Sequence, residues 1–372
     1  MKFMKASAEI IPIPAPSDTQ AVYQHLERIG RTCYKSEDKI TPESCRKFLQ
    51  NIFNRKHWAM LEHYPFVIED TNADLFMAIG RFYEINDINI QSKISYIKTS
   101  VCVVDLPNGG FKSRYLISGS ATGFNYLMEA LQMTKDNGVA FDDLETYMDF
   151  MKMMNIKFPH IFKNPYSDDM TTDTYEQLSE KYQFLSQDDV LAINDHDASV
   201  HLYMTVRFIC DRGVTHEIVR HRPASYAQES TRYCNYGASG CRFIIPSWFS
   251  PEATERLLAF DENPFIVFNK DPLEPFTVAE WAWVQAMQSD ENFYNRLIGE
   301  EWNPQQARSV LPNSVKTEIV MTANIPEWSH FFNMRVPKTA HPQMREVSIP
   351  LYNAARQIYI GHLPDLTKEA AE

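Results

Sequence analysis

Residues 200–208 carry an alternating pattern in which apolar side chains occupy every second position, at Val200, Leu202, Met204, Val206 and Phe208. A period of two over nine residues predicts a β-strand, because alternate side chains of a strand point to opposite faces of a sheet. The composition of residues 315–322 predicts a second strand. The fold must therefore contain a sheet.

Helix signals are interspersed with these strands. Thr277-Val278-Ala279-Glu280 is a capping box that opens a helix, and Asn303-Pro304-Gln305-Gln306 begins a short helix that Pro312 ends. Residues 326–335 and 341–359 predict two more helices. Because strands and helices follow one another without a regular β-α-β rhythm, we expect an α+β fold rather than a doubly wound one.

Two further segments bear on the predicted site. Thr41-Pro42-Glu43 reads as an N-cap followed by proline at the first helical position, and the helix is expected to end near Lys56. A short strand is predicted at Phe66 to Ile68. Beyond Gly213, a turn is expected to lead into a helix that carries His216 to Arg222.

The totals restrict the possible classes of protein. A chain of 372 residues fits one large domain or two smaller ones. The net charge of -12 argues against a general nucleic-acid-binding protein. No apolar run reaches the length of a membrane span, and six scattered cysteines without a C-x-x-C pair favour reduced thiols. We therefore expect a cytoplasmic protein with no membrane or nucleic-acid partner.

Arginine is concentrated in one part of this acidic chain. Residues 207–242 contain six arginines and no lysine, with Asp211, Glu217 and Glu229 as the only acids. Arginine without lysine suits fork-shaped recognition of a phosphate or carboxylate. A solvated face with ordinary ion pairs explains the composition equally well, so the composition alone leaves both readings open.

Residues 220–233 hold the densest set of polar groups. Arg220, His221, Arg222 and Arg232 fall within 13 residues, beside the hydroxyl groups of Ser225, Tyr226, Ser230 and Tyr233. Arginines and short hydroxyls together are suited to a phosphorylated ligand. An isolated pair of arginines is more often an ion-paired surface feature, so the residues alone do not settle the matter.

A metal site is not predicted in this region. His216-Glu217 followed by His221 is similar to the histidine pattern of zinc proteases, but the histidines are five positions apart rather than four. Five helical residues turn the second histidine about 140° away from the first. We expect no metal.

The same segment resembles the signature of the flavin-dependent thymidylate synthases. That signature is Arg-His-Arg, seven residues, then serine, with Arg-Tyr just beyond; here it reads Arg220-His221-Arg222, then Ser230, then Arg232-Tyr233. Residues 57–63, which are rich in histidine, resemble the family's flavin-contacting block near the N-terminus. Residues 308–312 and 324–335 resemble its C-terminal half. The resemblance covers residues 20–70 and 198–360.

The resemblance implies the family fold, an antiparallel-rich sheet with packed helices, and a set of site residues. The residues that would bind FAD are Glu62, Arg220, His221, Arg222, Gln228, Asn324, His330 and His57. Those that would bind the nucleotide are Arg220, Glu217, Gln228, Ser230, Thr231, Arg232, Arg308 and Arg335. Ala59 and Ala227-Gln228 depart from the family pattern, and Gln228 lacks the charge of the usual glutamate.

Arg335, Ser230 and Arg232 are the catalytic residues that the resemblance implies. Ser230 is assigned to positioning of the nucleotide, because no histidine–acid pair is visible that could activate it as a nucleophile. The implied reaction is methylation of dUMP to dTMP with bound FAD, with NADPH as reductant and methylenetetrahydrofolate as carbon donor. The implied assembly is a homotetramer with shared active sites.

Two other interpretations remain at this point. A related flavin enzyme that modifies a pyrimidine nucleotide, such as a hydroxymethylase, would keep the arginine set and change the one-carbon side. A non-catalytic nucleotide-binding protein of the same fold would keep the fold without the reaction. The intact arginine set argues against the second of these.

Residues 1–69 and 198–372 are expected to form the catalytic domain, and residues 70–197 a mostly helical insertion of unknown role. Between Lys135 and Asp197 this segment has 14 acidic residues and five lysines but no arginine. No residue in the segment is predicted to belong to the site. We expect the segment to pack on the catalytic domain or on a neighbouring subunit.

Overall fold

The computed structural model describes residues 1–106, 108–138, 141–165, 172–193, 195–259 and 274–371. Within these residues, four antiparallel strands form the first sheet, in the order β2-β7-β10-β8. Their bounds are Ser7–Ile11 for β2, Tyr203–Asp211 for β7, Lys316–Asn324 for β10 and Ser225–Gln228 for β8. The strands predicted at 200–208 and 315–322 are confirmed, with β7 shifted toward the C-terminus.

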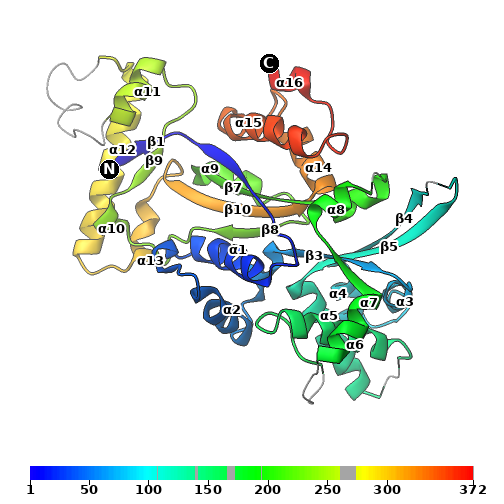
Figure 1. Cartoon of the computed structure of the whole chain (residues 1–372). Coiled ribbons are helices and arrows are strands. Elements are labelled where there is room, and N and C mark those ends of the chain that lie inside the picture. The colour runs from blue at the N-terminus through cyan, green and yellow to red at the C-terminus, as the bar shows by residue number, and fades with distance from the viewer. Residues whose placement is uncertain (107, 139–140, 166–171, 194, 260–273, 372) are drawn as a thin grey trace.

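Helices cover both faces of the first sheet (Figure 1). On one face lie α9 (Arg212–Ile218), α14 (Ile325–Arg335) and α15 (Pro342–Ile358), where Trp328 and Phe331 pack on Phe208. On the other face α1 (Thr19–Thr32) places Ile29 against Val320. The helices predicted at 326–335 and 341–359 are confirmed.

The predicted helix from His216 to Arg222 is wrong at its C-terminal end, because α9 stops at Ile218. The hydroxyl of Tyr226 donates to the carbonyl oxygens of Ile218, at 2.9 Å, and His221, at 2.6 Å. This contact satisfies carbonyl groups that the end of a helix leaves without a partner. Arg220 and Arg222 therefore lie in a turn between α9 and β8.

A second sheet, again among the described residues, has the antiparallel order β4-β5-β3-β6. The strands are β3 (Pro65–Asp70), β4 (Ile97–Asp105), β5 (Phe111–Ser120) and β6 (Tyr182–Leu185). β3 confirms the strand predicted at Phe66 to Ile68. Figure 1 shows the β4–β5 hairpin extending away from the rest of the molecule.

The segment 70–197 also contributes the helices α3 (Asp74–Phe82), α4 (Ile88–Ile94), α5 (Ala121–Asp136), α6 (Leu144–Lys157), α7 (Thr172–Lys181) and α8 (Gln187–Leu191). The apolar faces of α3 to α7 share one core with α1, with α2 (Ser44–Asn54) and with the 3-10 helix η2 (Trp58–His63), whereas Val190 of α8 belongs to the core of the first sheet. The helix predicted from Pro42 thus begins at Ser44. The domain boundaries at 69 and 197 stay a prediction. This core contains residues from both sides of the boundary at 69, so the two predicted parts do not have separate cores.

A third cluster forms around the parallel pair β1 (Lys2–Met4) and β9 (Arg242–Ile244). It includes α10 (Tyr236–Ser239), α11 (Pro251–Leu258) and α12 (Val278–Gly299), and α12 begins at the predicted Thr277–Glu280 capping box. The predicted short helix α13 (Pro304–Ala307) follows, then the 3-10 helix η6 (Arg308–Val310). The remaining elements are η1 (Glu37–Lys39), η3 (His196–His201) and α16 (Thr367–Ala371).

The described helices include none with the length and apolar character needed to cross a membrane.

Candidate active site

The turn that follows α9 exposes two arginines. Arg220 and Arg222 are exposed, whereas His221 between them is buried. Neither arginine forms an ion pair with another described residue. Since the alternative explanation of this segment was a face of arginines paired with acids, these two side chains favour an external anion as their partner.

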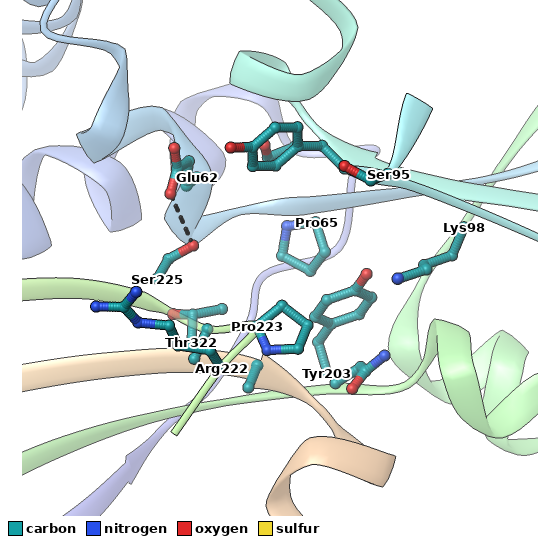
Figure 2. Close-up of a pocket in the computed structure, with 14 residues that line it drawn as sticks. Glu62, Pro65, Ser95, Lys98, Tyr203, Arg222, Pro223, Ser225 and Thr322 are labelled. Atoms are coloured by element: carbon teal, nitrogen blue, oxygen red, sulfur yellow. Dashed lines mark hydrogen bonds between the residues drawn. The ribbon is translucent and has the colours of Figure 1, made fainter. Parts of the chain in front are cut away.

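A pocket of about 560 Å³ opens next to this turn (Figure 2). Its lining includes three predicted flavin-site residues: Glu62 from η2, Arg222 from the turn and Asn324 from the end of β10. Pro65, Pro223 and Tyr203 provide apolar surface. A volume in the range of roughly 300–1,000 Å³ with apolar walls and a few polar groups is typical of small-molecule sites.

The carboxylate of Glu62 is held in place by Ser225, which lies in the segment 220–233. Ser225 Oγ donates a 3.0 Å hydrogen bond to Glu62 Oε2, and Figure 2 shows the pair at one end of the pocket. Burial raises the pKa of Glu62, and the hydrogen bond from Ser225 opposes that rise. Asn324 caps α14 through its Oδ1, which accepts from the backbone N–H of Glu327. Both polar side chains are therefore fixed by their neighbours.

A second cluster surrounds Arg335, at the C-terminal end of α14. Its Nη1 lies 2.5 Å from Glu217 Oε2, and its Nε donates to His221 Nε2 at 2.9 Å. The ring of His221 packs against His330 and Phe331. The structure thus brings together four predicted site residues, two from α14 and two from α9 and the turn that follows it.

His221 is a neutral imidazole at physiological pH. Burial, together with the charges of Arg335 and His330, lowers its pKa to about 4. Because Nε2 accepts the proton of Arg335 Nε, the ring carries its own proton on Nδ1. The buried Nδ1 has no hydrogen-bond partner among the described residues.

The other nucleotide-site candidates lie farther along the motif. Gln228 Nε2 donates to Thr215 Oγ1 at 3.0 Å and lies 3.4 Å from Thr317 Oγ1. The backbone N–H of Ser230 donates to the carbonyl of Cys33. Arg308 Nη1 donates to Thr231 Oγ1 at 3.3 Å. In the same loop the exposed guanidinium of Arg232 lies against the ring of Tyr233, 5.1 Å from its centroid.

His57 is placed elsewhere. It lines a separate pocket of about 540 Å³ with Tyr34, Ala59 and Met60, between α1, α2 and η2. The ring of Tyr34 lies 5.2 Å from that of Tyr233, so this pocket borders the loop that follows Ser230. Within one chain, the predicted site residues therefore lie in two pockets, in the Arg335 cluster and around the Ser230 loop.

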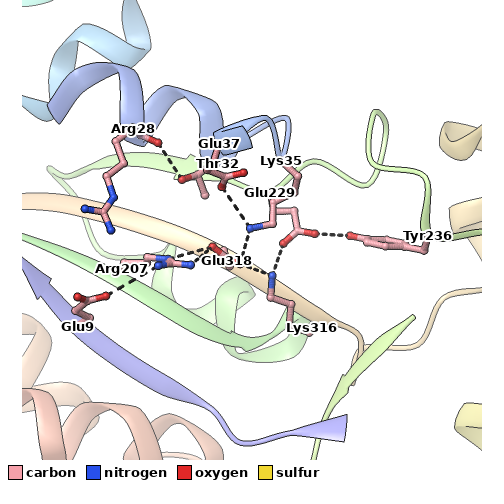
Figure 3. Close-up of polar contacts among 10 residues, drawn as sticks. All are labelled: Glu9, Arg28, Thr32, Lys35, Glu37, Arg207, Glu229, Tyr236, Lys316 and Glu318. Atoms are coloured by element: carbon pink, nitrogen blue, oxygen red, sulfur yellow. Dashed lines mark hydrogen bonds and ion pairs between the residues drawn. The ribbon is translucent and has the colours of Figure 1, made fainter. Parts of the chain in front are cut away.

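A buried charge network fixes the residue before Ser230 (Figure 3). Lys316 Nζ contacts Glu229 Oε2 at 2.8 Å and Glu318 Oε1 at 2.5 Å. Lys35 and Arg207 complete the pairing of Glu318. Because these five side chains lie between α1 and the first sheet, they fix the backbone that leads into the Ser230 loop.

The family model for "Thymidylate synthase complementing protein" matches residues 161–359, which are 199 of the 372 residues. The matched part includes the turn after α9, the Arg335 cluster and the Ser230 loop. This chain belongs to that family. The match leaves out residues 57–63, so the resemblance of that block stays a prediction, and it begins inside the predicted insertion.

Curated relatives of the family align with about half of the chain. The flavin-dependent thymidylate synthase of Geobacter sulfurreducens is 29% identical over 159 residues, which cover 43% of this chain and 56% of that protein. The enzyme of Corynebacterium efficiens is 32% identical over 150 residues, covering 39% and 54%, and that of Thermococcus onnurineus 27% over 184 residues, covering 49% and 66%. The chain thus spans just over half to about two thirds of the length of these relatives.

Among solved structures, the UMP/dUMP methylase PolB of Streptomyces cacaoi, bound with 5-Br UMP, is 18% identical. It superposes with a TM-score of 0.33 over 43% of this chain and 71% of that one. A likeness of this size does not establish a shared arrangement of the whole chain.

Residues outside the family motif also line the main pocket. The segment 70–197, in which no site residue was predicted, contributes Ser95, Tyr96, Lys98 and Ser120. The first residue of β7, Tyr203, also lines the pocket. No pattern in the sequence marks these residues, because they lie on separate elements that meet only in the folded chain.

Proposed function

We propose that this member of the family is a flavin-dependent thymidylate synthase that methylates dUMP to dTMP. The observation that carries the proposal is the turn after α9, where Arg220 and Arg222 are exposed beside the pocket of Glu62 and Asn324 and have no acidic partner among the described residues. The relatives described above, which carry this enzyme's name, align with 39% to 49% of the chain, and the family model matches the part that contains the turn.

The main pocket fits a flavin dinucleotide. Pro65, Pro223 and Tyr203 offer apolar walls for a planar ring, Arg222 offers a guanidinium that can donate hydrogen bonds, and Asn324 offers a side-chain amide. In this proposal Glu62, Arg220, His221, Arg222, Gln228, Asn324, His330 and His57 form the flavin site. When bound, FAD would supply the hydride-transfer chemistry of the methylation, with NADPH as the reductant and methylenetetrahydrofolate as the donor of the one-carbon unit.

The protein's own contribution is binding and electrostatics. Arg335 and Arg232 would stabilise the negative charge that develops on the uracil ring as its C5 becomes nucleophilic, and Ser230 would orient the nucleotide. Arg220, Gln228, Thr231 and Arg308 would complete the nucleotide site, and Glu217 would hold Arg335 in position until the nucleotide binds. Neutral His221 would orient Arg335 through the Nε2 contact, since it accepts a hydrogen bond without adding a competing charge.

The proposed assembly is a homotetramer with shared sites. In one chain, Arg232 lies on the Ser230 loop and Arg308 of η6 donates a hydrogen bond to Thr231 of that loop, whereas Arg335 lies at the end of α14. Residues from neighbouring subunits would bring the two sets to one nucleotide. Static light scattering of the purified protein tests this part of the proposal, and a monomer at micromolar concentration would contradict it.

The first experiment is an absorbance spectrum of the purified protein with and without added FAD and dUMP. We expect a bound-flavin spectrum that dUMP perturbs. Incubation with dUMP, NADPH and methylenetetrahydrofolate should then yield dTMP. If a hydroxymethyl nucleotide forms instead, the chain is the related pyrimidine-modifying enzyme, and if no flavin binds, the proposal is wrong.

A further inference from the structure

One wall of the main pocket comes from the segment 70–197. Ser95 follows α4, Tyr96 and Lys98 lie at the start of β4, and Ser120 ends β5. In Figure 2, Lys98 and Tyr203 lie at the opposite end of the pocket from Glu62 and Arg222. The pocket is therefore enclosed by the family motif on one side and by the second sheet on the other.

Lys98 is a half-buried cation without an ion pair to any described residue. Burial raises the pKa of Glu327, and the charges of His330 and Lys98 oppose that rise, so Lys98 influences this carboxylate from a distance without a direct bridge. The described residues that line the pocket include two cations, Lys98 and Arg222, and one acid, Glu62. The pocket thus has an excess of positive charge.

A buried histidine bridges β5 and the strand that carries Lys98. In the β4–β5 register, Lys98 lies opposite Ser118. Ser118 Oγ lies 2.8 Å from His201 Nδ1, and His201 Nε2 lies 2.9 Å from Ser100 Oγ. Burial lowers the pKa of His201 to about 3, so the neutral imidazole has one donor and one acceptor for the two hydroxyls.

His201 also belongs to η3, which leads directly into β7. Tyr203, two residues later, lines the pocket, and its hydroxyl lies 3.4 Å from Ser118 Oγ. The strand that carries Lys98 is therefore bonded to the chain that enters the first sheet. This arrangement holds the lysine against the pocket as part of the folded core.

We propose that Lys98 is a phosphate-binding residue of this pocket and that it holds the pyrophosphate of the flavin dinucleotide at the end of the pocket opposite Glu62 and Arg222. The proposal rests on the function proposed above. A pyrophosphate carries two negative charges, and Lys98 has no ion pair with a described residue that would compete for its ammonium group. The role of the segment 70–197 is then to complete the cofactor site.

The test compares Lys98→Met, which removes the charge but keeps most of the apolar stem, with Lys112→Met as a control. Lys112 lies in β5 of the same hairpin, is exposed, and is 3.7 Å from Glu69 rather than in the pocket. FAD and riboflavin, which has no phosphate, are titrated by flavin fluorescence. We expect Lys98→Met to raise the Kd for FAD about 10-fold to 100-fold, the effect of losing one charged hydrogen bond, with riboflavin unchanged.

Further variants separate a charge effect from a packing effect. Lys98→Arg should recover most of the FAD affinity, and Lys112→Met should bind both ligands like the wild type. Equal weakening of FAD and riboflavin by Lys98→Met, or no weakening at all while the wild type binds FAD, would overturn the inference. Failure of the wild type to bind FAD would instead overturn the proposed function. Should Lys98→Met not fold by circular dichroism, Lys98→Gln is measured in its place.

Discussion

The guanidinium of Arg335, which the proposed function assigns to binding of the nucleotide, forms an ion pair with Glu217 of the same chain. Glu217 Oε2 lies 2.5 Å from Arg335 Nη1, and the Glu217 side chain is 36% exposed. A partly exposed carboxylate can move away from its partner at small cost. We interpret Glu217 as a group that holds Arg335 in position until an anionic ligand replaces it.

Glu217→Gln tests this interpretation. Glutamine keeps a side-chain acceptor for Arg335 but removes the negative charge that competes with a phosphate or a uracil anion. We expect the Kd for dUMP to fall about threefold to tenfold, an effect in the range of modest exposed ion pairs. Isothermal titration with dUMP measures it, and weaker binding by the variant would mean that the carboxylate itself contacts the nucleotide.

Glu318 is the residue on which the buried charge network depends. Burial raises its pKa, but the charges and hydrogen bonds of Lys316 and Lys35 outweigh this effect and lower it to about 2. A folded-state pKa below the ordinary value of about 4.3 means that the ionised group stabilises the fold above that pH. The stabilisation is lost as the pH falls from about 5 toward 2.

Glu318→Gln should therefore lower the free energy of unfolding at pH 7 by about 3 kcal/mol, since a buried pair loses one partner. The deficit should shrink as the pH is lowered to 4 and then 3. Urea unfolding at each pH measures it. Glu9→Gln is the matched control, because Glu9 is exposed and 4.0 Å from Arg207, and it should change stability by less than about 0.5 kcal/mol. A deficit that does not depend on pH would contradict the role of the charge.

Among the elements, α14 connects the first sheet with the site. Its N-cap, Asn324, ends β10 and lines the main pocket, and its last residue is Arg335. The side chain of Asn324 also donates to the carbonyl of Val200 at 3.3 Å. One side chain therefore caps the helix, ties it to the end of η3 and faces the proposed cofactor.

Asn324→Ala should both destabilise the protein, by about 1 kcal/mol from loss of the cap, and raise the Kd for FAD. The control is Asn303→Ala, which removes the N-cap and capping box of α13 but lies outside the main pocket. We expect a similar or smaller loss of thermal stability in the control with unchanged FAD affinity. If both variants bind FAD like the wild type, Asn324 serves α14 alone.

Elements were predicted from the sequence where local chemistry decides them. The capping box at Thr277 and the alternation before Phe208 are local signals, and both led to correct assignments. The end of α9 was missed because the hydroxyl of Tyr226, which satisfies its terminal carbonyls, arrives from β8. A contact made through tertiary folding leaves no periodicity in the helix itself.

On the scale of the whole molecule, the family motif identified the region of the site but not its full lining. Glu62, Arg222 and Asn324 were singled out because they match family blocks, and all three line the main pocket. Lys98 and Tyr203 lie in strands of different sheets, and their proximity depends on how the two sheets meet. That junction is set by His201 and the two serines, a pattern that sequence spacing does not encode.

Since both sheets contribute to the main pocket, a bound ligand should couple them. The first sheet supplies Tyr203, Thr322 and Asn324, and the second supplies Pro65, Lys98 and Ser120. A ligand at about 100 times its Kd stabilises the bound conformation by about 2.7 kcal/mol. Openings that break the site therefore become about 100-fold rarer. Such openings include any separation of the two sheets.

Hydrogen exchange with and without FAD measures this coupling. The amides of β4 (Ile97–Asp105) and of β10 (Lys316–Asn324) should gain protection together, because each strand carries a lining residue. The amides of α12, which has no residue in the pocket, should exchange at unchanged rates wherever local fraying dominates. Protection confined to β10 would mean that the ligand contacts the family motif alone, and the segment 70–197 would then be a support for α1 and α2 rather than part of the cofactor site.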